Sequence, residues 1–255
     1  MKHSILILGG TTEARQLAET LATDPRFATT LSLAGRTRSP VAMPVPVRTG
    51  GFGGAQGLAA HLAENRVDLL IDATHPYAAQ ISANAAAASH LAGVPLIALR
   101  REGWVRQAGD LWQEVDRVPD AVTALGTTPR RVFLALGRQE LLPFEQAGGH
   151  AYVIRSVDPV EPPLALPSAI YILARGPFAE ADEHALLTEH RIDVVVSKNS
   201  GGSASYGKIA AARALGNEVI MVRRPPLPQV TSFETVKTLL AHLDHTFSGG
   251  AERGE

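Results

Sequence analysis

The chain of 255 residues contains no cysteine and no long hydrophobic run. Without cysteine, disulfide bonds, zinc–thiolate sites, iron–sulfur clusters and cysteine nucleophiles are all excluded. No apolar run approaches the roughly 18 residues that suggest a membrane-spanning helix, and the run Ile5–Leu8 is too short for a signal peptide. The 24 basic and 25 acidic residues leave a net charge of −1, so no broad field attracts nucleic acid or an anionic membrane. We therefore expect a cytoplasmic globular protein with neither of these partners.

Alternating short strands and helices indicate an α/β fold. The run Ile5–Leu8 has the apolar, β-branched composition of a strand buried on both faces. It ends in Gly9-Gly10, and the apolar residues that follow have helical spacing. Further strands are expected at 29–33, 45–47, 67–71, 95–99, 132–136, 152–155, 170–173, 194–197 and 219–222. This alternation with short loops predicts parallel sheets covered by helices on both faces.

Two halves of similar size are expected, residues 1–112 and 113–247, joined around Trp104–Val118 and followed by a flexible tail at 248–255. Pro76 is expected to open a helix that closes at Gly93. Thr231–Glu234 has the spacing of a capping box, which predicts the start of the last helix. Helix packing on the sheets accounts for the apolar helix faces, so no partner is required and a monomer is expected.

The first glycine turn is a candidate nucleotide site. In GGTTEAR, Gly9–Arg15, two glycines allow close approach of a ligand to the backbone, and the following helix N-terminus favours phosphate. The motif lacks the third glycine of G-x-G-x-x-G, and the Glu13 carboxylate would repel a phosphate on the helix axis. The alternative is a tight turn without a ligand. We expect a nucleotide phosphate at this turn, and the cofactor-binding residues here to be Gly9, Gly10, Thr11, Thr12 and Glu13.

The end of the second strand favours NADP over NAD. An NAD site places an acidic residue there for the ribose hydroxyl, whereas an NADP site uses arginine for the 2′-phosphate. Here the segment contains Arg36, Thr37 and Arg38 and no acid. The alternative is a solvated basic loop. Gly51, in the glycine-rich loop after the third strand, is a further candidate for close cofactor approach.

The motif DATHPYA, Asp72–Ala78, follows the fourth strand. Thr74 is expected to cap the next helix and to lie near the cofactor. His75 and Tyr77 are then left at the carboxyl edge of the sheet, where a histidine can donate a proton near neutral pH. The alternatives are a structural histidine and, for Asp72, a role in the turn alone.

The motif SKNSGGSASYGK, Ser197–Lys208, is rich in small polar residues that cannot form a core, which indicates a ligand or a moving role. Gly202-x4-Gly207-Lys208 also has the spacing of a P-loop, so a nucleotide hydrolase is an alternative. A P-loop needs Ser or Thr after the lysine to hold Mg²⁺, and this chain has Ile209. The Tyr-x-x-x-Lys pair of short-chain dehydrogenases, H-E-x-x-H and G-x-S-x-G are all absent, and no metal site is expected.

Together, GGTTEAR, DATHPYA, ALGRQEL (Ala135–Leu141) and SKNSGG (Ser197–Gly202) resemble the precorrin-6A reductases of cobalamin biosynthesis, in the same order along nearly the whole chain. The resemblance implies two Rossmann-like domains with the active site in the cleft between them. It also implies NADPH-dependent reduction of a ring double bond of precorrin-6A to give precorrin-6B. Relatives in the anaerobic pathway act on a cobalt-containing macrocycle. The arginines at 36 and 38 favour NADPH and the cobalt-free branch.

The macrocycle carries many carboxylates, so its site needs local cations and N–H donors rather than a high net charge. Its expected partners are His75, Tyr77, Arg138, Lys198, Asn199, Ser200, Gly201 and Gly202. Catalytic roles are expected for His75, Tyr77 and Lys198, although solvent could also supply the proton that follows the hydride. A non-catalytic NADP-binding module is the remaining alternative.

Overall fold

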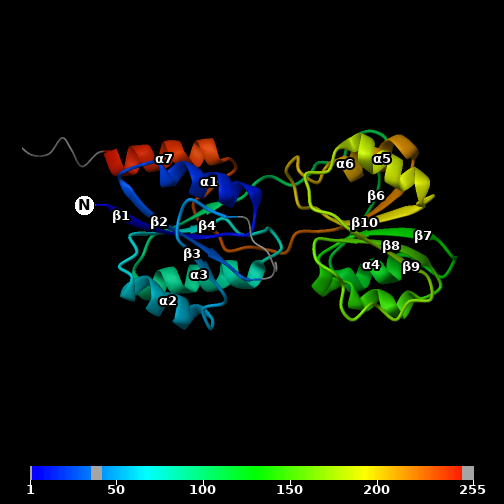
Figure 1. Cartoon of the computed structure of the whole chain (residues 1–255), viewed down its shortest axis with the longest axis horizontal. Helices are drawn as coiled ribbons and strands as arrows, with labels where there is room; N and C mark the ends of the chain where they lie inside the picture. Colours follow the sequence, from blue (N-terminus) through cyan, green and yellow to red (C-terminus); the bar gives the residue numbers. More distant parts are fainter. Residues whose placement is uncertain (1, 36–41, 249–255) are drawn as a thin grey trace, which may run out of the picture. The chain divides into compact units, whose positions relative to one another are not determined.

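The computed structural model describes residues 2–35 and 42–248, which contain two six-stranded parallel sheets (Figure 1). The first sheet has the spatial order β12 (Ser232–Phe233), β5 (Leu96–Leu99), β4 (Leu69–Asp72), β1 (His3–Leu8), β2 (Phe27–Leu33) and β3 (Val47–Thr49). The second has the order β6 (Leu111–Val115), β11 (Glu218–Val222), β10 (Val194–Lys198), β7 (Arg131–Ala135), β8 (Ala151–Ser156) and β9 (Ala169–Leu173). The predicted α/β fold with parallel sheets is confirmed.

Helices cover both faces of each sheet (Figure 1). On the first sheet, α1 (Thr12–Ala22) and α7 (Val236–Ser248) pack on one face, and α2 (Ala55–Glu64) and α3 (Ala79–Ala92) on the other. On the second sheet, α5 (Glu180–Glu189) and α6 (Gly207–Leu215) share one face, and α4 (Val118–Ala124) lies on the opposite face. No helix among the described residues combines the length and hydrophobicity needed to cross a membrane.

The central strands are buried because both of their faces are covered. Ile5–Leu8 are almost completely buried, as their composition predicts. On α1, the buried side chains Ala14, Leu17, Ala18 and Leu21 follow the helical period and pack on the sheet. The helical spacing after the first glycine turn therefore correctly predicts this helix.

The chain divides into two units that differ from the expected halves. The first unit comprises Met1–Glu102 and Pro226–Glu255, and the second comprises Gly103–Pro225. The cause is strand pairing, because β12 adds to the edge of the first sheet beside β5, and β6 adds to the second beside β11. The first sheet thus takes its edge strand β12 from the segment that follows β11, and the second sheet takes its edge strand β6 from the segment that follows β5. Of the expected tail, only Ser248, the last residue of α7, is among the described residues.

Two predicted helix starts are wrong. Ser232 and Phe233 form a strand instead of a capping box, and the hydroxyl of Thr235 accepts the Thr238 N–H at 3.1 Å at the start of α7. The helix expected from Pro76 begins only at Ala79 and has no side-chain cap, although Gly93 ends it as predicted. Thr74 is therefore not a helix cap, and its hydroxyl has another partner, described below.

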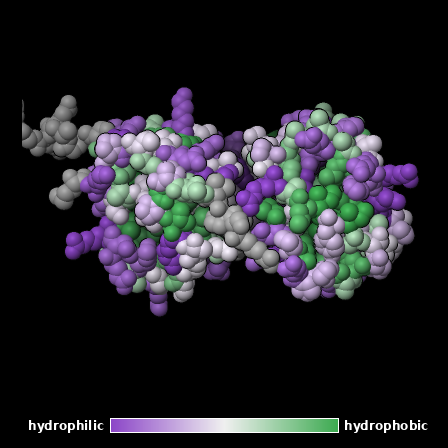
Figure 2. Space-filling model, viewed as in Figure 1, coloured by the Kyte–Doolittle hydropathy of each residue, from purple (hydrophilic) through white to green (hydrophobic). Residues whose placement is uncertain are grey.

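The second unit leaves an apolar edge exposed. Its edge strand β9 carries Ile170 and Leu173, which are 50% and 58% exposed. Figure 2 shows hydrophobic surface over the β8–β9 side of this unit. The expectation that helix packing accounts for the apolar helix faces does not cover this strand, whose apolar residues the sequence analysis did not identify as exposed.

Candidate functional site

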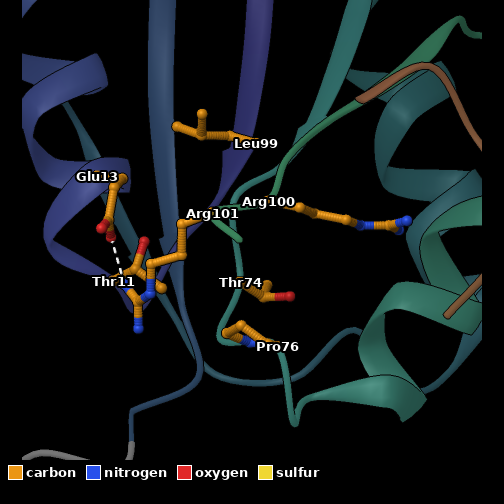
Figure 3. A pocket seen from close by; sticks show the side chains of 7 residues that line it. All are labelled: Thr11, Glu13, Thr74, Pro76, Leu99, Arg100 and Arg101. Carbon is orange, nitrogen blue, oxygen red and sulfur yellow. Dashed lines mark hydrogen bonds and ion pairs between the residues drawn. The ribbon is translucent and has the colours of Figure 1, made fainter. Parts of the chain in front are cut away.

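The first unit brings candidate residues together where its strand order reverses. The chain runs from β1 to β2 and β3 on one side and returns to β4 and β5 on the other, so the reversal lies between β1 and β4. Ligands of open parallel sheets bind at the carboxyl ends of the strands beside such a reversal. A pocket lies there (Figure 3), lined by Thr11, Glu13, Thr74, Pro76, Leu99, Arg100 and Arg101.

The glycine turn after β1 packs closely on β2 and leaves several backbone amides without an acceptor among the described residues. A Cβ on Gly9 would lie 2.6 Å from Cδ1 of Leu31, and Gly10 has a φ of +131°. Thr11 caps α1, because its hydroxyl accepts the Ala14 N–H at 3.0 Å and donates to the Ala73 carbonyl at 2.9 Å. The amides of residues 10–13 have no acceptor among the described residues. These amides suit an anion such as phosphate.

Glu13 does not stand alone at this helix start. Its carboxylate accepts a hydrogen bond of 2.5 Å from Nη1 of Arg101, which follows β5. Figure 3 shows Arg101 directed toward Glu13 and Thr11, and Arg100 directed the opposite way. The repulsion of phosphate expected from Glu13 is therefore offset by an arginine that pattern reasoning missed.

Asp72 organises the end of β4. The side chain is 2% exposed and accepts from the Thr74 hydroxyl and the Ser82 hydroxyl, each at 2.6 Å, and from the Thr74 N–H at 3.1 Å. Nη2 of Arg100 lies 3.5 Å from the same carboxylate. A carboxylate can only accept hydrogen bonds, so the Thr74 hydroxyl proton is committed to Asp72. Asp72 is thus more than a turn residue, because it holds Thr74 and Arg100 in place.

His75 and Tyr77 lie in the connection between β4 and α3, as expected for the carboxyl edge of this sheet. Both are partly buried, and their ring centres are 5.7 Å apart. The Tyr77 N–H contacts Nδ1 of His75 at 3.4 Å. The two side chains are therefore neighbours within one short segment.

The end of β2 leads into Arg36, Thr37 and Arg38, which lie outside the described residues. Nearby, Arg48 holds the glycine loop after β3, donating to the carbonyls of Gly50 at 2.6 Å and Gly51 at 2.7 Å. Its guanidinium carbon lies 3.7 Å from the ring centre of Phe52. The Gly51 carbonyl is therefore held by the protein, and any cofactor contact there would use another part of this residue.

The second unit has its own reversal, between β7 and β10. Lys198 ends β10 and forms an ion pair with Glu140, in the short helix η1 (Arg138–Glu140) after β7. Arg138 is exposed and donates to the Pro159 carbonyl at 3.1 Å. Lys198 thus ends one of the two strands that flank this reversal, and Arg138 lies in the short helix that follows the other; Glu140 was missed.

The loop after β10 is fastened by its carbonyl groups. The Trp104 indole donates to the Gly202 carbonyl at 2.8 Å, and Arg224 donates to the carbonyls of Asn199 at 2.8 Å and Ser200 at 3.0 Å. The Asn199 side chain accepts the Trp104 N–H at 2.6 Å and donates to the Trp104 carbonyl at 2.9 Å. Asn199 is therefore engaged in holding the loop.

The amides of this loop are left for other acceptors. The N–H groups of residues 201–205 have no acceptor among the described residues, whereas most of the loop's carbonyls are bonded. Because a backbone amide is an obligatory donor, this arrangement suits an anionic ligand. The amides of the predicted Gly201 and Gly202 are therefore candidate hydrogen-bond donors to a carboxylate ligand.

The P-loop alternative fails on geometry as well as on Ile209. Lys208 is 4% exposed, and its ammonium donates to the Ser205 carbonyl at 2.7 Å and lies 4.8 Å from the Trp104 ring centre. Burial lowers the pKa of Lys208 to about 7; Arg155 lowers it further, and Glu183 acts in the opposite direction. A buried lysine committed to its own loop is not positioned to contact nucleotide phosphates.

Several contributors were not predicted from the sequence, namely Arg100, Arg101, Trp104, Glu140 and Arg224. The pair Arg100-Arg101 directly after a predicted strand and the acid in ALGRQEL were available signals. Trp104 lies in a segment interpreted as a joint between halves, and nothing in its neighbours indicated a partner in the loop after β10.

Comparison with known proteins identifies the family. A sequence model of the family described as precorrin-6x reductase CbiJ/CobK matches residues 4–244. The chain is 62% identical over 244 residues to a precorrin-6A reductase of a Sinorhizobium species, covering 94% of each chain. It is 48% identical to the precorrin-6A reductase of Rhodobacter capsulatus, covering 98% of each. A solved structure titled CobK precorrin-6A reductase is similar with a TM-score of 0.91 at 47% identity, covering 99% of this chain and 100% of that one. The chain belongs to the precorrin-6x reductase family CbiJ/CobK.

Proposed function

We propose that this protein reduces a ring double bond of precorrin-6A, giving precorrin-6B, with NADPH as the reductant in cobalamin biosynthesis. The observation that carries the proposal is the first unit's reversal, where a pocket lined by Thr11, Glu13 and Arg101 lies beside a glycine turn whose amides have no acceptor among the described residues. Membership of the family supports the reaction class. Both relatives described above are named for the cobalt-free substrate, which supports that branch.

The residues of the first unit fit a dinucleotide. The amides of residues 10–13 would hold the diphosphate, with Gly9 packed so closely on Leu31 that a side chain at this position would have to displace it. Thr74, held by Asp72, would line the adjacent part of the site. When bound, NADPH supplies the hydride. The protein's task is to position the acceptor carbon and exclude water.

Selectivity for NADPH over NADH is assigned to Arg36 and Arg38, with Thr37 between them, because planar guanidinium groups bind a phosphate through paired donors. Changing both arginines to alanine should weaken NADPH binding by about 100-fold and NADH binding by less than about threefold, since only NADPH carries the 2′-phosphate. Fluorescence titration measures both affinities. Equal weakening of both cofactors would contradict this assignment.

The second unit is assigned to the carboxylates of the macrocycle. Lys198 supplies a cation, Arg138 a second one at the neighbouring strand end, and the amides at Gly201 and Gly202 supply neutral donors. Ser200 belongs to the same loop, and Asn199 contributes by keeping the loop in shape. Charged side chains and backbone amides together bind carboxylates without a high net charge.

The proton that follows the hydride is assigned to a group within this set. His75 and Tyr77 are neighbours on one segment, and Lys198 is an ammonium donor on another. Measuring kcat against pH for His75→Gln, Tyr77→Phe and Lys198→Met separates them, because only loss of the donor removes the corresponding pH dependence. Unchanged profiles in all three variants would instead assign the proton to solvent.

The first experiment is titration of the purified protein with NADPH and NADH, followed by nicotinamide and tryptophan fluorescence. We expect NADPH to bind at least about tenfold more tightly than NADH, and turnover with precorrin-6A to consume NADPH. ATP with Mg²⁺ is the control ligand. Absence of binding by either cofactor would overturn the proposal, and ATP turnover would revive the P-loop alternative.

We also propose that the protein acts as a single chain in the cytoplasm, where reduced nicotinamide cofactors are available. Light scattering after size-exclusion chromatography should give a mass near 27.0 kDa. A doubled mass would contradict the monomer and would direct attention to the exposed β9 edge.

A further inference from the structure

The ion pair between Glu13 and Arg101 lies at the start of α1, in the proposed cofactor site. Glu13 is the second residue of α1, and its carboxylate is therefore in the first turn, beside the amides of residues 10–13, which have no acceptor in the described ranges 2–35 and 42–248. Arg101 reaches this carboxylate from the end of β5, so the contact links residues 88 positions apart. Both side chains are mostly buried, at 24% and 18% exposed, and both line the pocket.

The charges at this helix start are balanced in a specific way. A helix N-terminus behaves as roughly half a positive charge, which a first-turn carboxylate neutralises. With Glu13 alone, the site would therefore repel a diphosphate. The guanidinium of Arg101 restores a positive balance, and its planar set of donors can contact a carboxylate and a phosphate together.

We propose that Arg101 is a ligand of the cofactor diphosphate and that Glu13 is a positioning residue that limits the strength of this contact. The inference rests on the proposed function, because it concerns the same dinucleotide. Glu13 keeps Arg101 at the glycine turn before the cofactor arrives and competes with the phosphates for it afterwards. The pair therefore sets affinity for the reduced and the oxidised cofactor alike, and it keeps the oxidised product from remaining bound.

The two charges predict opposite effects on binding. Glu13→Gln keeps the shape and removes the competing charge, so it should tighten binding of both NADPH and NADP⁺ by about three- to tenfold. Arg101→Gln should weaken both by about 30-fold or more, since it removes a charged hydrogen bond and leaves Glu13 uncompensated. Arg101→Lys keeps the charge and should recover part of the affinity.

The test is fluorescence titration with NADPH, and competition with NADP⁺, on the full chain and its variants. Glu19→Gln is the matched control, because Glu19 is an exposed acid on the same helix beyond its first turn; its affinities should stay within about twofold of the parent. If the pair only fastens β5 to α1, Glu13→Gln will weaken binding and lower the melting temperature, as Arg101→Gln does. That result, or no change in affinity for Glu13→Gln, would overturn the inference. Failure of the parent chain to bind NADPH would instead overturn the proposed function.

Discussion

The two units share one strand order and differ in the connections at its reversal. After β1, the first unit has an eleven-residue helix whose capped start presents amides that have no acceptor within the described part of the chain. At the same place after β7, the second unit has two 3₁₀ helices, η1 and η2 (Leu142–Ala147). The second unit instead has its long glycine-rich loop after β10, where the first has the compact DATHPYA turn after β4. The sheet thus determines where a ligand can bind, and the connections determine which ligand.

The two units also share one feature, an ion pair between a glutamate and a cation. In both units a glutamate shortly after the first inner strand pairs with a cation from another strand end, Glu13 with Arg101 and Glu140 with Lys198. Each pair keeps a cation at a strand end without leaving an uncompensated charge. Under the proposed function, the first unit binds the cofactor and the second binds the carboxylated macrocycle. The following measurements test that division and the side chains that support each site.

The largest effect is expected from Lys198→Ala. Removing a cation that binds substrate carboxylate should lower kcat/KM for precorrin-6A by about 100-fold. The dissociation constant of NADPH should stay within about twofold, because the cofactor is assigned to the other unit. Steady-state kinetics and cofactor titration give the two values. An equal loss in both would break the division between the units.

Lys208→Met should stabilise the protein by about 2 kcal/mol near pH 7, because it removes a buried amine that costs free energy when charged. The folded pKa is about 7 and the ordinary value is 10.5, so the unfolded chain binds more protons between these values and the parent's stability rises with pH there. The advantage of the variant should therefore shrink toward pH 10. Lys237→Met, at an exposed position on α7, is the control. Denaturant unfolding at several pH values measures the difference in free energy of unfolding between Lys208→Met and the parent. A difference that does not change with pH would contradict burial of the amine as its cause.

Asn199→Ala should raise KM for precorrin-6A by about tenfold, because it removes both hydrogen bonds between the Asn199 side chain and the Trp104 backbone. The loop that carries these amides would then be held less firmly. The NADPH affinity serves as the internal control and should not change. An unaltered KM would show that the loop keeps its shape through Arg224 and the Trp104 indole alone.

The smallest effect is expected from Thr11→Ala, which removes the cap of α1 and the bond to Ala73. Loss of a cap should lower the free energy of unfolding by about 1 kcal/mol. NADPH binding should weaken about threefold through the disturbed turn. Thr20→Ala, in the last part of the same helix, should have little effect on the cofactor. An unchanged free energy of unfolding in Thr11→Ala would show that the Thr11 cap does not stabilise α1.

Strands and helices that depend only on residues close together in the sequence could be predicted from it. The buried strands and α1 follow from composition and helical period, and Gly93 ends its helix as expected. The edge strand β12 could not be predicted, because two residues beside Glu234 resemble a helix start until β5 is available as a partner. The Glu13–Arg101 pair was equally hidden, since its members are distant in sequence and meet only through the order of the strands. Positions at strand ends were predictable, whereas their partners were not.

The exchange of edge strands also orders the events of synthesis. A ribosome completes the second unit's sequence at Pro225, before Ser232 and Phe233 exist, so the first sheet still lacks its sixth strand when the second is complete. Closing a pairing between Ala98 and Ser232 spans more than half the chain, and such non-local contacts form slowly. The N-terminal sheet therefore finishes last, and a nascent chain truncated before β12 leaves an open β5 edge that invites aggregation.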